Sequence, residues 1–234
     1  ASGVAPMTPA ADFAPIAVLG AGSWGTALAM QLARAGQPVT LWGRNAADLQ
    51  DLANHRINRR YLPGIALPAS VLPDADLRRV VGGHRELLVC VPSHAFRATL
   101  AAVRRDLKPG TRLAWATKGF EHSTGRLPHE VAAAELGTGV PVAVLSGPTF
   151  AREVAAGLPT AMTVAASDPA YAVALAARLS DRTFRAYTSE DMIGVEVGGA
   201  VKNVLAIGAG ISDGLGFGAN TRIALITRGL AEMT

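Results

Sequence analysis

The sequence predicts an α/β fold: a doubly wound, mostly parallel sheet with helices on both faces, followed by the first helices of an all-α region. Three observations predict it. A glycine-rich turn joins a short apolar run to a helical pattern near the amino end. Short apolar runs then alternate with helical patterns to about residue 190, as in strands buried on both faces. Beyond that point, long helical patterns carry few charges.

The composition restricts the class of protein. Half of the 234 residues are hydrophobic, which is enough for a large core. The net charge is +4, but basic residues are scattered singly or in pairs, so we expect no nucleic-acid partner. The single cysteine, Cys90, excludes an internal disulfide and a cysteine-based metal cluster, and its apolar neighbours predict a small buried side chain. No His, Cys and carboxylate set has metal-ligand spacing, so no metal is expected.

Targeting signals are not visible in the sequence. Residues 1–14 have an acidic residue, two prolines and no basic start, so they predict a disordered tail rather than a signal peptide. We find no apolar segment of about 18 residues without helix breakers, and therefore expect no membrane span. A cytoplasmic location is the default expectation.

The glycine-rich turn has the spacing G-x-G-x-x-G, at Gly20, Gly22 and Gly25. It follows an apolar run over residues 16–19 and opens a helical pattern that ends near Gly36. In a dinucleotide-binding (Rossmann) turn, the first glycine permits the tight turn, the second lets the backbone approach a pyrophosphate, and the third lets helix and strand pack closely. The free N–H groups of the first helical turn also favour a phosphate. The alternative is an ordinary strand-to-helix turn.

The second predicted strand covers residues 37–42, and Asn45 is a plausible cap for a helix through residue 54. The end of this strand faces the adenosine ribose in a dinucleotide fold, where an acidic residue favours NAD and an arginine favours NADP. Arg44 is the first long side chain past the strand, so the sequence favours NADP(H) over NAD. The alternative is that Arg44 is a solvated residue at the start of a helix.

The middle of the chain alternates strands and helices. Residues 57–73 predict an irregular loop, and residues 77–81 a weak helix or strand. We expect strands over residues 86–91, 112–117, 140–145, 161–165 and 183–187, and helices over residues 93–105, 124–135, 149–156 and 169–179.

Polar residues follow several of these strands directly. They are Ser93, Lys118 and residues 146–149, and the glycine turn has the same position. In an open parallel sheet, ligands bind at the carboxyl ends of the strands. The ammonium of Lys118 there suits a phosphate or a substrate oxygen. The alternative is a surface lysine that ends a strand.

The sequence pattern changes near residue 191, where small and apolar residues begin to predominate. Residues 195–210 predict a helix that is small or apolar on all sides, and such a helix is expected to be buried in a larger domain. Lys202 lies in its middle, where a buried amine can exchange protons near neutrality. The alternatives are a lysine paired with a buried carboxylate such as Glu196, or one at a subunit interface. Another helix is expected from about residue 220.

Several motifs occur together along the chain, among them GAGSWGT, VTLWGR, WATKG, LSGPTFARE and GGAVKNV. The sequence from about Ile16 to its last residue resembles the bacterial NAD(P)-dependent glycerol-3-phosphate dehydrogenases. The resemblance implies reversible reduction of dihydroxyacetone phosphate to sn-glycerol 3-phosphate with NAD or NADP, which supplies phospholipid synthesis. It implies Lys202 as the catalytic proton donor or acceptor, and it leaves a homodimer open.

The resemblance also implies the other site residues. The cofactor-binding positions are Gly20, Gly22, Ser23, Trp24, Gly25, Arg44, Lys118 and Ala151. The substrate-binding positions are Lys118, Gly147, Thr149, Lys202 and Asn203.

The family continues into a further helical domain, whereas this sequence stops at Thr234 within a helical pattern. We therefore expect residues 15–190 to form the dinucleotide-binding domain and residues 191–234 to be the first helices of a truncated second domain. Two other functions stay open: a related dehydrogenase acting on a β-hydroxyacid, and a fragment that binds the cofactor without turnover.

Overall fold

The computed structural model describes residues 13–232, so the tail expected over residues 1–14 lies almost wholly outside the described residues. Within them, one eight-stranded sheet has the strand order β3-β2-β1-β4-β5-β6-β7-β8. The strands are β1 (Ile16–Leu19), β2 (Val39–Trp42), β3 (Val71–Asp74), β4 (Glu86–Val89), β5 (Arg112–Trp115), β6 (Val142–Ser146), β7 (Thr160–Ala166) and β8 (Phe184–Ser189). Neighbouring strands are parallel except β6 and β7, which are antiparallel. The expected doubly wound, mostly parallel sheet is confirmed.

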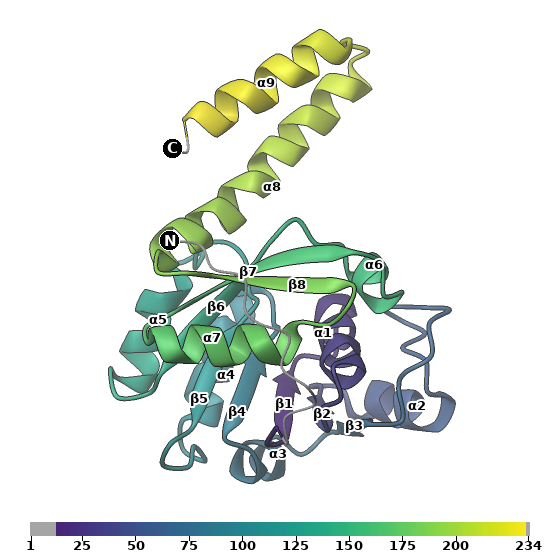
Figure 1. The fold of residues 1–234 in the computed structure, drawn as a ribbon, viewed down its shortest axis with the longest axis vertical. Helices are drawn as coiled ribbons and strands as arrows, with labels where there is room; N and C mark the ends of the chain where they lie inside the picture. The colour runs from purple at the N-terminus through teal and green to yellow at the C-terminus, as the bar shows by residue number, and fades with distance from the viewer. Residues whose placement is uncertain (1–12, 233–234) are drawn as a thin grey trace.

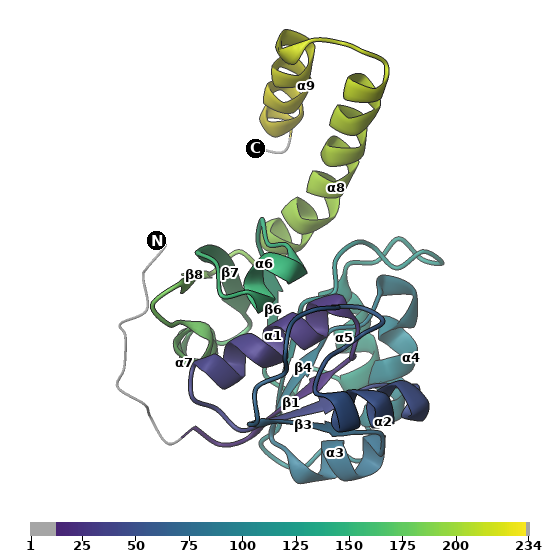
Figure 2. The same cartoon turned by 90° about the vertical axis from the view of Figure 1, so that its right-hand side faces the viewer.

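Helices cover both faces of this sheet (Figures 1 and 2). They are α1 (Ser23–Arg34), α2 (Ala46–His55), α3 (Leu77–Gly83), α4 (Ser93–Val103), α5 (Pro128–Leu136), α6 (Ala151–Ala155) and α7 (Pro169–Leu179). Strand β1 shows why its residues are apolar without alternation. Ile16 and Val18 pack in the core with α1 and α7, whereas Ala17 and Leu19 pack in the opposite core with α3, α4 and α5. All four residues of β1 are buried, as a central parallel strand requires.

Several element boundaries differ from the sequence prediction. The loop predicted over residues 57–73 ends in strand β3, which contains Pro73. Proline is tolerated there because β3 is at the edge of the sheet. Residues 77–81 belong to a helix, α3. Helix α5 begins at Pro128 and not at residue 124, since proline suits the first turn of a helix.

Two further helices, α8 (Met192–Gly214) and α9 (Ala219–Ala231), form a hairpin that extends away from the sheet (Figures 1 and 2). Within the described residues most of α8 is exposed, whereas the sequence predicts a helix buried in a larger domain. Glu196, Gly199 and Ala200 are buried against the sheet domain, but Val204 is 67% exposed and Ile207 65%. Only the first turns of α8 reach the sheet, and in the part of the chain described the later turns pack against α9.

Helix α8 is the segment among the described residues that bears on the expectation of no membrane span. It is long and apolar enough to cross a membrane by length and composition, because the glycines within it do not interrupt the helix. One such helix is weak evidence, since apolar helices of folded domains meet the same criteria.

Candidate active site

The glycine turn has a different steric environment at each of its three glycines. Gly20 has φ +128°, and a Cβ there would lie 2.5 Å from the carbonyl oxygen of Cys90. A Cβ on Gly25 would lie 1.9 Å from the carbonyl oxygen of Gly20. A Cβ on Gly22 would meet nothing within 4 Å. Gly20 and Gly25 are therefore required by the fold, whereas Gly22 leaves the backbone open to the cleft beside it.

Helix α1 begins directly after this turn. Gly22 is its N-cap residue, no side chain caps the helix, and the first turn contains no acidic residue. The N–H groups of the first turn and the positive end of the helix dipole therefore stay available to an anion. This arrangement fits the pyrophosphate of a dinucleotide.

A cleft of about 450 Å³ lies over the glycine turn and the carboxyl ends of β1, β2 and β4. This volume is within the usual range for small-molecule sites. Arg44 lines the cleft, is exposed, and forms no ion pair with residues 13–232. Arg60, also on the cleft, donates to Asp48 at 2.9 Å. Arg44 thus offers the cleft an unneutralised positive charge.

Asn45 and Cys90 complete the walls of the cleft. The side chain of Asn45 accepts hydrogen bonds from the backbone N–H groups of Ala47 and Asp48 in the first turn of α2, so the predicted cap is confirmed. Cys90 is half-buried, packs against the core and lines the cleft. Burial raises the pKa of its thiol, which therefore stays neutral.

Two lysines from distant parts of the chain meet at one carbonyl. Lys118 follows β5, Lys202 lies in α8, and Gly147 follows β6. Lys202 Nζ donates a hydrogen bond to the carbonyl oxygen of Gly147, and Lys118 Nζ lies 3.5 Å from the same oxygen. The ammonium of Lys118 is also 5.4 Å from the ring centroid of Trp24, in the first turn of α1. The lysine pair therefore lies at the start of α1, next to the glycine turn.

The charges of this pair are not neutralised within the protein. Neither Lys118 nor Lys202 forms an ion pair in the described part of the chain. Burial first, and the positive charge of Lys202 second, lower the pKa of Lys118 to about 8. The alternative that Lys202 pairs with Glu196 is wrong, because Glu196 is bound to Trp115 and His129 instead. Two ammonium groups without a carboxylate make a site for an anion or for a developing negative charge.

The backbone around the pair is held by local hydrogen bonds. Thr117 Oγ1 donates to the carbonyl oxygen of Val91 at 2.7 Å, which ties the end of β5 to the end of β4 just before Lys118. Thr149 N donates to the carbonyl oxygen of Gly147 at 3.0 Å, which tightens the turn that both lysines contact. The buried Thr149 Oγ1 has no partner among the described residues and is free to bind a ligand.

Other predicted site residues lie around this centre. Ser23 is half-buried in the first turn of α1, and Ala151 is half-buried at the start of α6, where it packs against the core that contains α1. Asn203 is exposed on α8 next to Lys202. The structure thus brings Trp24, Lys118, Gly147 and Lys202 together and places Arg44 on the wall of the cleft over the glycine turn.

A model of the NAD-dependent glycerol-3-phosphate dehydrogenase N-terminus matches residues 15–172, and a model of the C-terminus of the same enzyme matches residues 191–234. The chain belongs to the NAD-dependent glycerol-3-phosphate dehydrogenase family.

Individual relatives agree with this assignment. The chain is 57% identical over 220 residues to a glycerol-3-phosphate dehydrogenase [NAD(P)+] from Pseudoalteromonas translucida, covering 94% of this chain and 66% of that protein. It is 54% identical over 222 residues to the enzyme of that name from Edwardsiella ictaluri, with the same coverages of 94% and 66%. The crystal structure of glycerol-3-phosphate dehydrogenase from Coxiella burnetii has a TM-score of 0.89 at 49% identity, covering 94% of this chain and 67% of that one. The chain therefore spans about two thirds of the length of these relatives.

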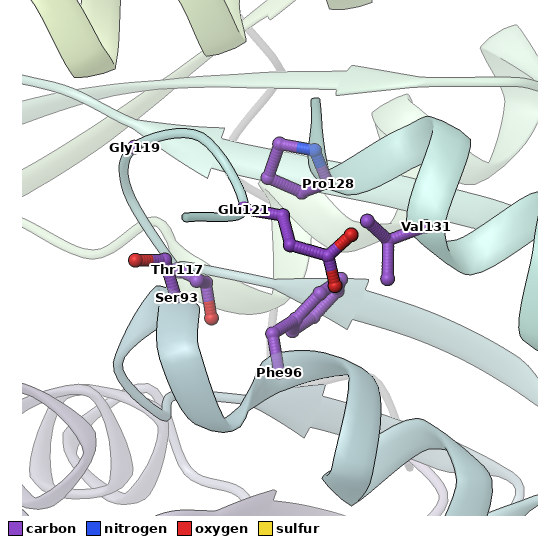
Figure 3. A pocket seen from close by; sticks show the side chains of 7 residues that line it. All are labelled: Ser93, Phe96, Thr117, Gly119, Glu121, Pro128 and Val131. Carbon is purple, nitrogen blue, oxygen red and sulfur yellow. The ribbon is translucent and has the colours of Figure 1, made fainter. Parts of the chain in front are cut away.

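A second hollow, between α4 and the loop after β5, is shown in Figure 3. Its volume is about 10 Å³, room for one water molecule at most. Phe96 and Val131 line it together with the carboxylate of Glu121, which is bound by Arg97. This hollow is a packing defect beside an ion pair and not a ligand site.

One group of residues in this chain was not predicted from the sequence. Glu196 was considered only as a partner of Lys202, and Trp115 and His129 were not considered. These side chains come from α8, β5 and α5, and Glu196 is 81 residues from Trp115 and 67 residues from His129 in the sequence. No local pattern connects them, so only the fold reveals that they meet.

Proposed function

We propose that this chain carries the cofactor site and the catalytic lysine of a glycerol-3-phosphate dehydrogenase. The reaction is the reversible reduction of dihydroxyacetone phosphate to sn-glycerol 3-phosphate with NAD(P)H, which supplies glycerophospholipid synthesis. Family membership supports the reaction class. The observation that carries the proposal is the meeting of Lys118 and Lys202 at the Gly147 carbonyl, beside Trp24 and the glycine turn.

The two lysines have distinct roles in this mechanism. The nicotinamide cofactor, when bound, supplies the hydride that reaches the C2 carbonyl carbon of the ketone. The ammonium of Lys202 donates a proton to the carbonyl oxygen as negative charge develops there, and takes a proton back in the reverse direction. Lys118 adds a second positive charge beside this oxygen or the substrate phosphate. Gly147 orients both amines through its carbonyl oxygen.

The remaining site residues are proposed on the same basis. Ser23, Trp24 and Ala151 bind the cofactor at the starts of α1 and α6, together with the three glycines of the turn. Thr149 and Asn203 bind the substrate on either side of the lysines. The buried, unpartnered Thr149 Oγ1 supports its role, because such an atom gains a hydrogen bond when a polar ligand is present.

We further propose that residues 15–190 form the dinucleotide-binding domain and residues 191–234 begin a helical substrate domain. The exposed apolar side chains of α8 and α9 support this division, since a larger domain would cover them. Arg44, unpaired at the end of the cleft, supports a preference for NADP(H). A cytoplasmic location and a homodimer stay predictions.

The test is the variant Lys202→Ala, with Lys108→Ala as the control. Lys108 is exposed in a turn after α4, far from the cleft. Loss of a positioned acid is expected to lower turnover of dihydroxyacetone phosphate by about 10²- to 10⁴-fold, while NADPH affinity stays within about twofold of wild type. Lys108→Ala should change neither quantity. Loss of NADPH binding with unchanged turnover would refute the assignment of Lys202.

A second function is NADPH binding without turnover. The glycine turn and the cleft over it, which fit a dinucleotide, favour this function independently of the lysine pair. Fluorescence titration of NADPH separates this function from catalysis: a binding module shows tight NADPH binding and no turnover. A turnover assay that compares β-hydroxyacids with sn-glycerol 3-phosphate tests the other class of dehydrogenase, which would oxidise the β-hydroxyacids faster.

A further inference from the structure

We propose that Glu196 is the positioning residue that holds Lys202 at the Gly147 carbonyl, by fixing the first turns of α8 to β5, the strand that Lys118 follows. The inference rests on the proposed function for the role of Lys202. It adds a buried cluster, the anchor cluster, defined as Glu196, Trp115 and His129.

The carboxylate of Glu196 is the centre of the anchor cluster. Its side chain is 0% exposed. Trp115 Nε1 donates to Glu196 Oε1 at 3.0 Å, and the backbone N–H of His129 donates to the same oxygen at 3.0 Å. His129 Nδ1 lies 2.6 Å from Glu196 Oε2. Both carboxylate oxygens therefore have partners, as a buried acidic group requires.

Each member of the cluster belongs to a different element. Trp115 is the last residue of β5, three residues before Lys118. His129 lies in the first turn of α5, and Glu196 in the second turn of α8. One carboxylate thus ties α8 to the strand that carries the other lysine of the site.

The register of α8 against the sheet depends on this contact. A Cβ on Gly199 would lie 2.6 Å from Ser146 Oγ, so α8 passes directly over the end of β6. Lys202, one turn further, reaches Gly147 just beyond the same strand. A slip of one residue would move the helix by about 1.5 Å and turn it by about 100°, which would take Lys202 away from Gly147. Among the described residues, the contacts of α8 with the sheet domain lie in its first turns, up to Lys202, and Glu196 is the buried charged group among them.

If Glu196 only stabilised the fold, replacing it would change the free energy of unfolding and leave the two lysines unaffected. Burial raises the pKa of the Glu196 carboxyl, and the hydrogen bonds from His129 and Trp115 oppose this shift. Replacing it is therefore expected to change stability in any case. The positioning role is distinguished by its effect on the two lysines, which a purely structural carboxylate would leave unchanged.

The chain offers a matched control for Glu196→Gln. Glu86 is 5% exposed and is bound by Arg112 Nε at 2.7 Å, but it lies at the amino end of β4, on the edge opposite the lysine pair. Glu86→Gln removes the same charge from an equally buried pair. Trp115→Phe is the second variant, because it removes one hydrogen bond to Glu196 and keeps the carboxylate.

Three quantities are measured on wild type and each variant. NADPH affinity is measured by fluorescence titration. Reactivity of Lys118 and Lys202 is measured by competitive acetylation between pH 6 and pH 11, followed by mass spectrometry, and needs no turnover. The third quantity is kcat and KM for dihydroxyacetone phosphate.

The proposal predicts that Glu196→Gln moves the titration midpoint of Lys118 upward from about 8, because Lys202 no longer stands beside it. It also predicts a fall in kcat of about tenfold to a hundredfold, the effect of a small misplacement, with NADPH affinity unchanged. Trp115→Phe should also raise the titration midpoint of Lys118 and lower kcat, each by less than Glu196→Gln does. Glu86→Gln should shift neither.

Glu196→Gln and Trp115→Phe variants that match wild type in lysine reactivity overturn the proposal. The proposal is also overturned if Glu86→Gln shifts the reactivity of the lysines as much as Glu196→Gln does. The shift would then reflect a general loss of stability and not the position of Lys202. If wild type binds NADPH but does not reduce dihydroxyacetone phosphate, the proposed function fails, and the acetylation profiles still decide whether Glu196 positions the lysines.

Discussion

The substitution Gly25→Ala separates the two roles that glycine has in the turn before α1. The added Cβ would lie 1.9 Å from the carbonyl oxygen of Gly20 and 3.0 Å from Cys90 Cβ. Because the closest atom belongs to the backbone, either the turn or α1 must move. Such overpacking costs about 1–3 kcal/mol of the free energy of unfolding, and we expect the upper end of that range.

Gly22→Ala is the matched variant, three residues earlier. Gly22 has φ −73°, which alanine adopts freely, and its Cβ would meet nothing within 4 Å. The free energy of unfolding should therefore change by no more than about 0.5 kcal/mol. The methyl group would point into the cleft, where the backbone approaches the pyrophosphate. We expect NADPH affinity to fall about tenfold or more, equivalent to about 1.4 kcal/mol.

Urea unfolding followed by circular dichroism, with and without NADPH, measures both effects. Gly25→Ala should lose stability without ligand, and Gly22→Ala should lose only the stabilisation that NADPH adds. The reasoning is refuted if the two variants lose equal stability without ligand, or if Gly22→Ala binds NADPH as tightly as wild type.

The remaining predictions concern charge. Arg44→Ala should weaken NADPH binding about tenfold and leave NADH binding within twofold, because only the 2′-phosphate requires the guanidinium; equal loss for both cofactors in paired titrations would contradict this role. The lowered pKa of Lys118 means that its ammonium is lost as pH rises through about 8. KM for dihydroxyacetone phosphate should therefore rise above that pH, and a KM that is constant from pH 7 to pH 10 would count against the anion-binding role. The unfolded chain still binds this proton up to a pH of about 10.4, so the contribution of Lys118 to the free energy of unfolding should increase between the two values.

The features that could be predicted from the sequence are those that depend on residues close together in the chain. The glycine turn was predictable because Gly20, Gly22 and Gly25 follow an apolar strand and open a helix. The gathering of Lys118 and Gly147 at one edge was predictable because parallel strands place their carboxyl ends together. Strand β3 was missed because Pro73 is typical of a loop, and only the order of the sheet shows that its strand is at an edge.

Long-range packing determined the rest. The exposure of α8 could not be read from its apolar residues, because Val204 and Ile207 would look the same in a buried helix. The partner of Glu196 could not be found by spacing either. On the helix, Lys202 is six residues away and faces another direction, whereas Trp115 and His129 reach the carboxylate only through the fold. The residues of the candidate site could therefore be predicted from the sequence, whereas their contacts with one another became known only from the fold.

The central claim is that two amines from different elements share one carbonyl beside the cofactor turn. The most direct test is the pKa of Lys118, measured by NMR on the protein with ¹³C-methylated lysines, in wild type and in Lys202→Met. The structure predicts a value of about 8 in wild type and a higher value once the positive charge of Lys202 is removed. An ordinary lysine value of about 10.4 in wild type, or no change in Lys202→Met, would contradict the claim.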